Sequence, residues 1–421
     1  MKVLVLGSGV VGVTTAYYLW RDGHEVTVLD RQSAPALETS YGNAGGLCPS
    51  FAGPWAAPGM LGKVLGQLFE SEPPIRFRPK LDVHQWQWLA RWVANCNSAS
   101  FSRNKLCMQR VAHYSQACLK ELAAQTLIDD FDFHSDGTLQ LFRTEAEVEI
   151  GHLATKALTE LGIPWRMLGA TEIDAFEPAL LQRRAKVAGA LHLPADASGD
   201  SHKFSLALAR YLQARDVRFL FNTPIQAITH DAGAISGVQT PLQRLTADAY
   251  VVALGSEAPL LLRPLGIALP VYPVKGYSIT VPMRADGPSI GTALMDEHNK
   301  IMMSRLGERL RVAGMAELTG YDLTLDSAQR ERLIRVVREY FPSGLAFDQV
   351  EFWAGLRPMT PDGPPILGKT HWPNLYLNSG HGSNGWTQSC GTSRIVADLV
   401  NGKSPAIDLT GLTGRRFGIA P

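Results

Sequence analysis

The hydrophobic pattern is most regular in the first thirty residues. Residues 3–6 form a short run of valine and leucine, which predicts a buried strand. Residues 10–19 form an apolar run compatible with a helix, and Gly23 follows as a residue suited to a helix C-cap. Residues 26–29 repeat the strand pattern and end on Asp30. The chain is therefore predicted to begin with a strand–helix–strand unit.

An amphipathic helix is predicted at the start of residues 84–125, and a second helix over about 105–124. Trp86 does not lie on the apolar face of the first of these two helices. A tryptophan-rich amphipathic helix can rest on a membrane surface, but it more often packs on its own domain, which we favour. The residues that share its face are Gln85, Trp88, Leu89, Trp92, Val93 and Cys96.

The rest of the chain alternates between helix-like and strand-like hydrophobic patterns, and after residue 262 the strand-like pattern dominates. Prolines punctuate the stretch after residue 262, where alternating segments predict antiparallel strands and a second, substrate-facing domain built into the first. A strand, a glycine-rich turn and a helix are expected over 374–400. The fold class is therefore α/β. The other predicted strands are 136–142, 217–221, 225–229, one within 248–256, 274–281, 299–306 and 308–315, and the helices are 145–161, 205–214 and 326–340.

Composition narrows the classes of function. The chain has 421 residues, 45% of them hydrophobic and 19% charged, which is typical of a globular protein with two domains. A net charge of +1 without a basic block argues against nucleic acid as a partner. No apolar run reaches the roughly 18 residues of a membrane span, so membrane contact is expected to be peripheral at most. Five cysteines without a C-x-x-C pair predict a reducing, cytoplasmic compartment and no metal site.

Gly7, Gly9 and Gly12 follow the first strand in the spacing G-x-G-x-x-G. The first permits a tight turn, the second lets a pyrophosphate approach the backbone, and the third lets the helix pack on the strand. Free N–H groups at the helix start favour phosphate. Asp30, at the tip of the second strand, is placed to accept hydrogen bonds from ribose hydroxyls. We infer a dinucleotide site. The glycines in register disfavour the alternative, a secretory signal.

Small residues also dominate residues 38–59 and 380–385. The first stretch either runs over the cofactor, with Ser40 and Asn43 as hydrogen-bonding groups, or is an ordinary surface loop. The second precedes a helix and predicts another anion- or ring-binding helix N-terminus. Arg357 is expected on a turn between strand-like segments of 353–368.

The stretches LGSGVVGV (6–13), ETSYGNAG (38–45), PWAAPG (54–59), GLRPMTPDG (355–363) and GHG-x-x-GWT (380–387) carry a family resemblance. Nearly the whole chain is similar to the flavin-dependent oxidoreductases of the D-amino-acid oxidase and glycine oxidase type. It most resembles the bacterial FAD-dependent D-amino-acid dehydrogenases of the small-subunit type. PWAAPG and GLRPMTPDG are far more specific than the glycine fingerprint.

The resemblance implies FAD and a glycine oxidase-like fold, in which a Rossmann-like FAD-binding domain carries a second α+β domain built on an antiparallel sheet. The FAD-binding domain would comprise 1–58, 196–262 and 350–421, and the substrate domain 59–195 and 263–349. The implied FAD contacts are Gly7, Gly9, Val10, Val11, Gly12, Asp30, Arg31, Ser40, Asn43, Ala44, Gly45, Gly46, Leu47, Pro224, Ile225, Ala253, Gly255, Arg357, Gly380, Gly382, Ser383, Asn384, Gly385, Trp386 and Thr387.

The resemblance also implies the substrate site. Arg305 corresponds to a residue that binds the substrate carboxylate, Arg357 to a second arginine of that pocket, and Tyr277 and His381 to pocket walls. Two guanidinium groups could hold the carboxylate and place Cα–H over flavin N5 for hydride transfer. A D-amino acid would then yield an imino acid, which hydrolyses to a 2-oxo acid and ammonia.

The chain departs from the family pattern at residues 46–51, at Asn299 and at Ser383-Asn384, all in segments that line the pocket. A dehydrogenase for D-proline or D-hydroxyproline is therefore one alternative. A nicotinamide-dependent dehydrogenase and a non-catalytic flavoprotein subunit are two others. The residues leave the electron acceptor open among oxygen, a quinone and an electron-transfer flavoprotein. The resemblance favours a respiratory acceptor, reached from the cytoplasm or at the inner face of the cytoplasmic membrane.

Overall fold

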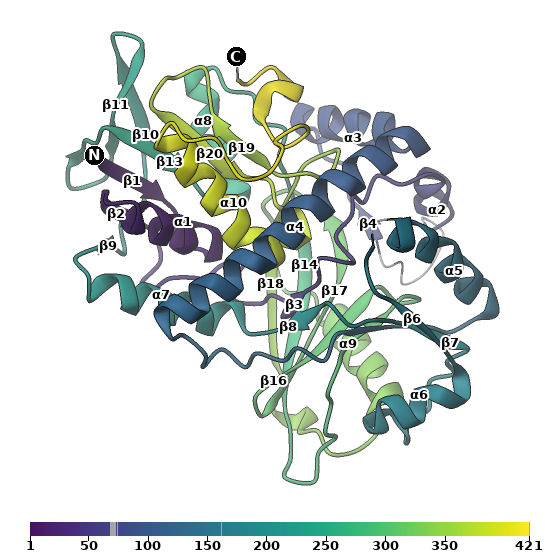
Figure 1. The fold of residues 1–421 in the computed structure, drawn as a ribbon. Coiled ribbons are helices and arrows are strands. Elements are labelled where there is room, and N and C mark those ends of the chain that lie inside the picture. Colours follow the sequence, from purple (N-terminus) through teal and green to yellow (C-terminus); the bar gives the residue numbers. More distant parts are fainter. Residues whose placement is uncertain (68–72, 74, 161, 421) are drawn as a thin grey trace.

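Two β-sheets, each assembled from segments that lie far apart in the sequence, form the frame of the computed structural model (Figure 1). The structure describes residues 1–67, 73, 75–160 and 162–420. Because the chain passes between the sheets several times, neither sheet can form from one continuous stretch.

Within the described residues, the first sheet has six strands in the order β19-β20-β13-β1-β2-β9. β1 lies inside this sheet, parallel to both β2 and β13, while β19 at one edge is antiparallel to β20. The carboxyl ends of β1 and β13 therefore lie side by side, where open parallel sheets bind ligands. The strands are β1 Lys2–Leu6, β2 Glu25–Leu29, β9 Arg218–Leu220, β13 Ala249–Val252, β19 Ile366–Lys369 and β20 Leu375–Ser379.

Both faces of this sheet are covered. Val3 and Val5 of β1 pack into a core with helices α1, α4, α7 and α10. Leu4 and Leu6 point the other way, into a core with α8 and the small sheet β10-β11-β12, as strand alternation requires. The elements are α1 Val10–Arg21, α4 Ser98–Thr126, α7 Ser201–Gln213, α8 Ala258–Leu262, α10 Gly385–Val400, β10 Ala227–Asp231, β11 Ala234–Gln239 and β12 Arg244–Leu245.

The second sheet has nine strands among the described residues, in the order β18-β14-β17-β16-β15-β5-β7-β6, with β4 also pairing with β17. Most neighbours are antiparallel, and one face packs a core against α9 Ser327–Tyr340. The strands are β4 Ile75–Phe77, β5 Thr138–Phe142, β6 Arg166–Gly169, β7 Gly189–Leu193, β14 Tyr272–Pro282, β15 Ala293–Asp296, β16 Ile301–Leu306, β17 Arg309–Leu318 and β18 Glu351–Met359.

Helix α3, Val83–Asn95, covers part of the second sheet and begins at Asp82, whose carboxylate accepts from the His84 N–H. Trp88 and Trp92 are buried in a cluster with Tyr272, and Trp88 Nε1 donates to the Met359 carbonyl at 2.8 Å. The expectation that this helix packs on its own chain is confirmed. The remaining helices are α2 Met60–Gln67, α5 Glu145–Glu160 and α6 Ala170–Phe176.

Several expectations differ from the structure. The second predicted helix, α4, begins at Ser98, seven residues early, because the Asn97 side chain caps it. Although α4 falls in the predicted substrate segment, it packs on the six-stranded sheet. Conversely, β18 belongs to the nine-stranded sheet, so the boundary predicted at residue 350 does not separate the sheets. The strand expected at 225–229 is β10, which starts at Ala227. Residue 161, in the helix predicted at 145–161, lies outside the described residues.

Helices α4 and α10 touch most closely at Gly391 and Ser115, where α4 crosses in front of α10 (Figure 1). The Gly391 N–H donates to Ser115 Oγ at 3.0 Å. A Cβ at Gly391 would lie 2.8 Å from Ser115 Cα, so a larger residue would separate the helices.

We expect Gly391→Ala to lower the free energy of unfolding by about 1–3 kcal/mol, because the added methyl group overpacks this contact. The matched control is Gly62→Ala in α2, where nothing lies within 4 Å of the added carbon. That variant should be as stable as the parent or slightly more stable. Urea unfolding of both variants measures the difference, and equal midpoints would contradict the tight helix contact.

Candidate active site

The glycine turn after β1 is built by contacts that exclude side chains. Gly7 has φ +102°, which favours glycine, and a Cβ at Gly12 would lie 1.9 Å from the Gly7 carbonyl oxygen. Helix α1 therefore starts directly above the turn. Gly9, the N-cap residue of α1, has no side chain that could accept from the first N–H groups of the helix. The Val10 N–H donates to Ser40 Oγ at 3.0 Å. This arrangement fits the pyrophosphate of a dinucleotide.

Asp30 stands beside this turn. One carboxylate oxygen accepts from the Ser8 N–H at 2.6 Å and from Ser8 Oγ at 2.7 Å, and the other accepts from the Gln32 N–H at 2.8 Å. Only the second oxygen keeps a lone pair for a ribose hydroxyl, since a carboxylate has about four acceptor sites and the first oxygen already accepts two hydrogen bonds. Asp30 thus braces the glycine turn as well as being available to a ribose.

Three other expected adenosine-side contacts, Arg31, Pro224 and Ile225, lie at the edge of this region. Arg31 forms ion pairs with Glu38 at 2.6 Å and Glu257 at 3.6 Å. The Thr223 N–H donates to the Asp30 carbonyl at 2.8 Å, so Pro224 and Ile225 emerge next to the end of β2.

Residues 39–48 are held in place from three sides. Thr39 Oγ1 donates to the Leu356 carbonyl at 2.8 Å, and Ser201 Oγ donates to the Ser40 carbonyl at 2.6 Å. Gly46–Leu47 forms the short strand β3, which pairs with β8 Ala197–Ser198. The stretch is therefore not an ordinary mobile surface loop but a segment clamped between the two sheets.

The buried side chain of Arg311 supplies a further clamp, which the sequence analysis missed. Its guanidinium donates to the Tyr41 carbonyl at 2.7 Å and to the Asn43 carbonyl at 3.3 Å. The Asn43 side chain in turn accepts from the Gly45 N–H at 2.8 Å. The sequence did offer one signal for this role, because Arg311 is a charged residue at an inward position of the strand predicted at 308–315.

The C-terminal glycine-rich turn closes onto the same region. Cys48 N–H donates to Thr387 Oγ1 at 3.2 Å, and Ser379 Oγ donates to the Gly255 carbonyl at 3.4 Å. The turn Gly382–Asn384 leads into α10, whose first N–H groups have no side-chain cap. The segments around residues 7–12, 39–48, 253–256 and 380–387 therefore converge at the carboxyl ends of β1, β13 and β20.

Trp386 and His381 belong to the interior beneath that turn. The Trp386 ring packs on Phe131 and Phe204, and its Nε1 donates to the Gly199 carbonyl at 3.0 Å. His381 is 3% exposed, and its Nε2 lies 3.0 Å from Thr392 Oγ1. Burial lowers the pKa of His381 to about 3, so the imidazole is neutral near pH 7.

Arg357 lies within β18 rather than on the turn expected from sequence. Its guanidinium lies over Gly276, where a Cβ would meet it at 2.3 Å, and 5.8 Å from the centre of the Trp55 ring. It donates to the Met315 carbonyl at 2.7 Å and the Gly314 carbonyl at 3.4 Å. Burial lowers the pKa of Arg357 to about 10, which leaves it cationic near pH 7.

The structure does not bring Arg305 to Arg357. On β16, Ser304 and Leu306 face Gly45, and Arg305 between them projects from the opposite face of the strand. Its Nε donates to the Gly307 carbonyl at 3.0 Å, and it lies 3.9 Å from Glu308. The expected two-arginine clamp is therefore not present in this arrangement.

Tyr277 also lies on the opposite face of the sheet from Arg357. It pairs with Ala354 across the strands, its ring stacks on Phe352, and its hydroxyl donates to Glu317 at 3.1 Å. Burial and the Glu317 carboxylate raise the pKa of Tyr277. Its role in the structure is to bury this carboxylate beside Lys275, not to line the region around Arg357.

Two tryptophans on the Arg357 side of the sheet were not singled out from the sequence. Trp353 packs directly on Gly42 and Gly355, where a Cβ would lie within 2.0 Å of its ring. Trp55 faces Arg357 and belongs to the stretch PWAAPG, which was noted only as a family signature. Trp353 therefore joins the 39–48 segment to β18, and Trp55 lies beside the guanidinium.

None of the described helices is long and apolar enough to cross a membrane. In the same residues, no three or more His, Cys, Asp or Glu side chains are grouped so that they could hold a metal ion.

Comparison with known proteins agrees with this geometry. The sequence profile described as FAD dependent oxidoreductase (DAO) matches residues 2–399. Among curated relatives named D-amino acid dehydrogenase, the one from Bradyrhizobium diazoefficiens is 48% identical over 417 residues, covering 99% of each chain. The one from Chromohalobacter salexigens is 47% identical over 418 residues, covering 99% of this chain and all of its own.

Solved structures show the same fold at low sequence identity. Glycine oxidase from Geobacillus kaustophilus superposes with a TM-score of 0.75 at 23% identity, covering 98% of both chains. Glycine oxidase from Bacillus cereus gives 0.73 at 21% identity, covering 96% of this chain and 95% of its own. The predicted glycine oxidase-like fold is confirmed. With the profile match across nearly the whole length, this chain belongs to the FAD dependent oxidoreductase family.

Proposed function

We propose that this protein oxidises D-amino acids to imino acids, which hydrolyse to 2-oxo acids and ammonia. The observation that carries the proposal is the position of Arg357. A cationic guanidinium, facing Trp55 and bonded only to backbone carbonyls among the described residues, lies where the FAD-binding segments meet the large sheet. The full-length similarity to relatives named D-amino acid dehydrogenase supports the same activity.

In this proposal, Arg357 holds the α-carboxylate of the substrate. Its two backbone bonds use only part of the five N–H donors of a guanidinium, and the others can donate to a carboxylate. The carbonyls of Gly314 and Met315 fix the direction of the guanidinium, and the centre of the Trp55 ring lies 5.8 Å from it, a cation–π arrangement. Arg305 does not bind the substrate in this proposal, because its side chain projects from the opposite face of β16.

The residues around the glycine turns would hold FAD. The Gly7–Gly12 turn and the start of α1 suit the pyrophosphate, Asp30 the ribose, and the 39–48 and 380–387 segments the ring system. The bound flavin supplies a two-electron acceptor for the Cα–H bond. His381 is neutral and turned toward Thr392, so we assign it support of the turn rather than proton transfer.

Electrons from the substrate would then pass to a quinone or to an electron-transfer protein, in the cytoplasm or at the inner face of the cytoplasmic membrane. The names of the relatives include the word dehydrogenase, which supports an acceptor other than oxygen.

The direct test is an anaerobic absorbance scan of the purified protein. We expect a yellow protein whose flavin absorbance bleaches on addition of D-amino acids and persists on addition of their L-enantiomers. D-Proline and D-hydroxyproline belong in the same series, because their cyclic amines test the narrower alternative. A colourless protein, or a flavin that no amino acid reduces, would contradict the proposed function.

Arg357→Lys should raise the KM for the D-amino acid by about tenfold to a hundredfold, because hydrogen bonds to a charged group contribute about 1.5–3 kcal/mol. Arg305→Lys is the matched control, since it replaces an arginine of the same sheet on the opposite face. It should change the KM by less than about twofold, because a surface ion pair such as that of Arg305 with Glu308 contributes little free energy. Steady-state kinetics with an artificial acceptor measures both, with flavin content confirming that FAD remains bound. Equal effects of the two substitutions would remove Arg357 from its proposed role.

His381 predicts a pH dependence of stability. Its pKa is about 3 in the folded chain against 6.5 as an ordinary value, so below pH 6.5 the unfolded chain binds the additional proton. Stability from this group is fully present above pH 6.5 and falls by about 1.4 kcal/mol per pH unit below it. His381→Asn should remove this component. Urea midpoints at several pH values between about 5 and 7 compare the two proteins, and parallel pH profiles would show that His381 is not buried in its neutral form.

A further inference from the structure

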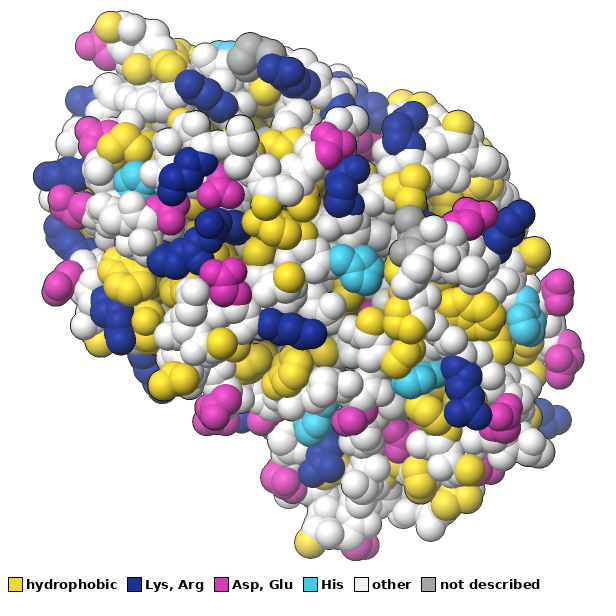
Figure 2. All heavy atoms as spheres, in the orientation of Figure 1, with side chains coloured by type: hydrophobic (Ala, Val, Ile, Leu, Met, Phe, Trp, Pro, Cys, Tyr) yellow, Lys and Arg dark blue, Asp and Glu magenta, His cyan; other side chains and the backbone are white. Residues whose placement is uncertain are grey.

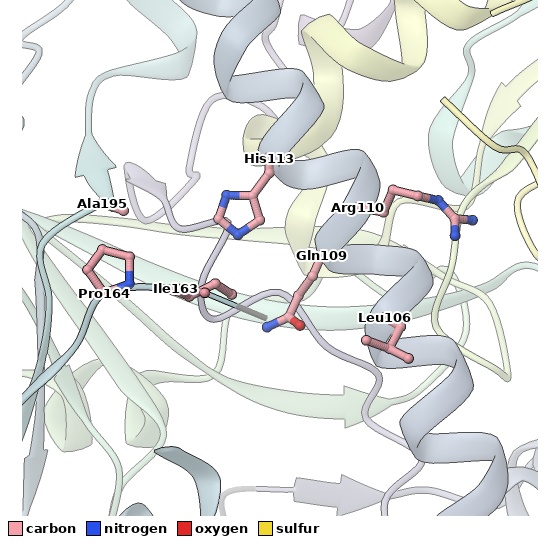
Figure 3. Close-up of a pocket in the computed structure, with 8 residues that line it drawn as sticks. Leu106, Gln109, Arg110, His113, Ile163, Pro164 and Ala195 are labelled. Atoms are coloured by element: carbon pink, nitrogen blue, oxygen red, sulfur yellow. The ribbon is translucent and has the colours of Figure 1, made fainter. Parts of the chain in front are cut away.

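Arg357 combines accessible surface with unused hydrogen-bond donors, unlike the cavity beside α4. That cavity has a volume of about 330 Å³, but its unpaired polar atoms, Gln109 Oε1 and His113 Nε2, are enclosed by protein (Figure 3). On the outer face shown in Figure 2, basic and acidic side chains are interspersed, with no patch of one sign among the described residues. Arg357 is only partly buried, and two carbonyls use only part of its five N–H donors.

The side chain of Arg357 crosses a neighbouring strand to reach its partners. In the nine-stranded sheet, β14 lies between β18, which carries Arg357, and β17, which carries the accepting carbonyls of Gly314 and Met315. The crossing point is Gly276 of β14. A Cβ there would lie 2.3 Å from Arg357 Nη1 and 2.4 Å from its Cζ. The guanidinium therefore occupies the space that any side chain at position 276 would need.

The two carbonyls are presented by a β-bulge in β17. The pairing with β14 shifts at Gly276, which lies opposite two residues of β17, Met315 and Ala316. Met315 has φ +55°, a left-handed conformation that a bulky residue rarely adopts. Its side chain shares the core under α9 with Val312, although strict alternation would place residues 312 and 315 on opposite faces. The bulge thus turns the Met315 side chain into that core and its carbonyl toward Arg357.

The bulge also marks the point where β17 changes partner, which is the simpler explanation for it. Gly314 is the last residue of β17 to pair with β16, and Ala316 is the first to pair with β4. A change of partner explains the interrupted ladder but not the direction of the freed carbonyl. That carbonyl accepts from Arg357 Nη1 at 2.7 Å, the length of a charge-assisted hydrogen bond. Left-handed backbone at residues other than glycine is also concentrated at ligand sites.

We propose that Gly276 is a positioning residue for Arg357, acting together with the Met315 bulge. The proposal rests on the proposed oxidation of D-amino acids, in which Arg357 holds the substrate carboxylate. The missing side chain at position 276 opens the path across β14, and the carbonyls of Gly314 and Met315 fix the guanidinium at its end. The remaining N–H donors are then held in one direction before the substrate arrives, which lowers the ordering cost of a bidentate bond to a planar carboxylate. Gly276 thereby favours substrates with an α-carboxylate without touching them.

Gly276→Ala tests the role in binding. The added methyl group meets the end of a flexible side chain, so we expect the sheet to form and the guanidinium to move away from its carbonyls. The KM for the D-amino acid should rise by about tenfold or more, the loss expected for a misplaced charge-assisted hydrogen bond, while flavin content is unchanged. The matched control is Gly237→Ala in β11, where the added carbon would lie 2.6 Å from Arg244 Nε. This strand glycine also lies under an arginine, but in the small sheet, and its substitution should leave the KM unchanged.

Urea unfolding of a double-mutant cycle tests the geometry without any activity. Arg357→Ala empties the space over Gly276, so adding Gly276→Ala to it should cost less stability than Gly276→Ala costs in the parent. Additive changes would show that the guanidinium does not occupy that space, and they would overturn the proposal. If Gly276→Ala alone does not fold, a folded double variant supports the same crossing, whereas an unfolded one overturns it.

The outcomes separate this proposal from the proposed function. An unchanged KM in Gly276→Ala, beside a raised KM in Arg357→Lys, would overturn the positioning role and leave the proposed function intact. Equal rises in KM for Gly276→Ala and Gly237→Ala would overturn the positioning role as well. A parent holoenzyme whose flavin no amino acid reduces would refute the proposed function, while the cycle would still decide whether Gly276 positions the guanidinium.

Discussion

The contact between the start of α1 and the turn that leaves β1 is the constraint on which the rest of the structure depends. The Gly7 carbonyl oxygen occupies the space that a Cβ at Gly12 would need. This approach positions α1 over β1 and β13, and the core beneath it then receives α7, α10 and α4. Ser8 and Asp30 hold the same turn from the side of β2. The phosphate-binding geometry and the packing of the six-stranded sheet are therefore two consequences of one contact.

The second sheet is joined to this frame through the backbone of β18. The Leu356 carbonyl accepts from Thr39 and from Ser256, which belong to two different segments of the region proposed to bind FAD. Arg311 of β17 holds the carbonyls of Tyr41 and Asn43. These bonds place Arg357, the next residue of β18, directly beside the segments proposed to hold the flavin ring. A rigid junction of this kind suits hydride transfer, which depends strongly on the alignment of the reacting atoms.

The faces of the large sheet divide the polar residues into two groups with different environments. Arg357, Arg311 and the two tryptophans lie on the side of the FAD-binding segments. Tyr277, Lys275 and Glu317 lie on the other side, where they neutralise one another close to the core under α9. Arg357 keeps donors free for a ligand, whereas Tyr277 and Lys275 are both engaged with Glu317. This difference, and not residue type, separates the proposed substrate site from a structural ion-pair cluster.

The glycine oxidase-like fold was implied by the family resemblance. By itself the residue pattern determined the strand–helix–strand unit, the glycine turn, Asp30 and the alternation between α/β and antiparallel segments. These features are local, because glycine spacing and hydrophobic period act over a few neighbouring residues. Only the tertiary structure decided which face each strand residue takes. Arg305 and Tyr277, which the family resemblance assigned to the substrate pocket, lie on the opposite face of the sheet from Arg357. Strand alternation leaves two orientations, and the choice depends on what packs on each face. Long-range packing also assigned α4 to the first sheet and β18 to the second, and it revealed the contacts of Arg311. None of these has a local signal strong enough to specify its partner.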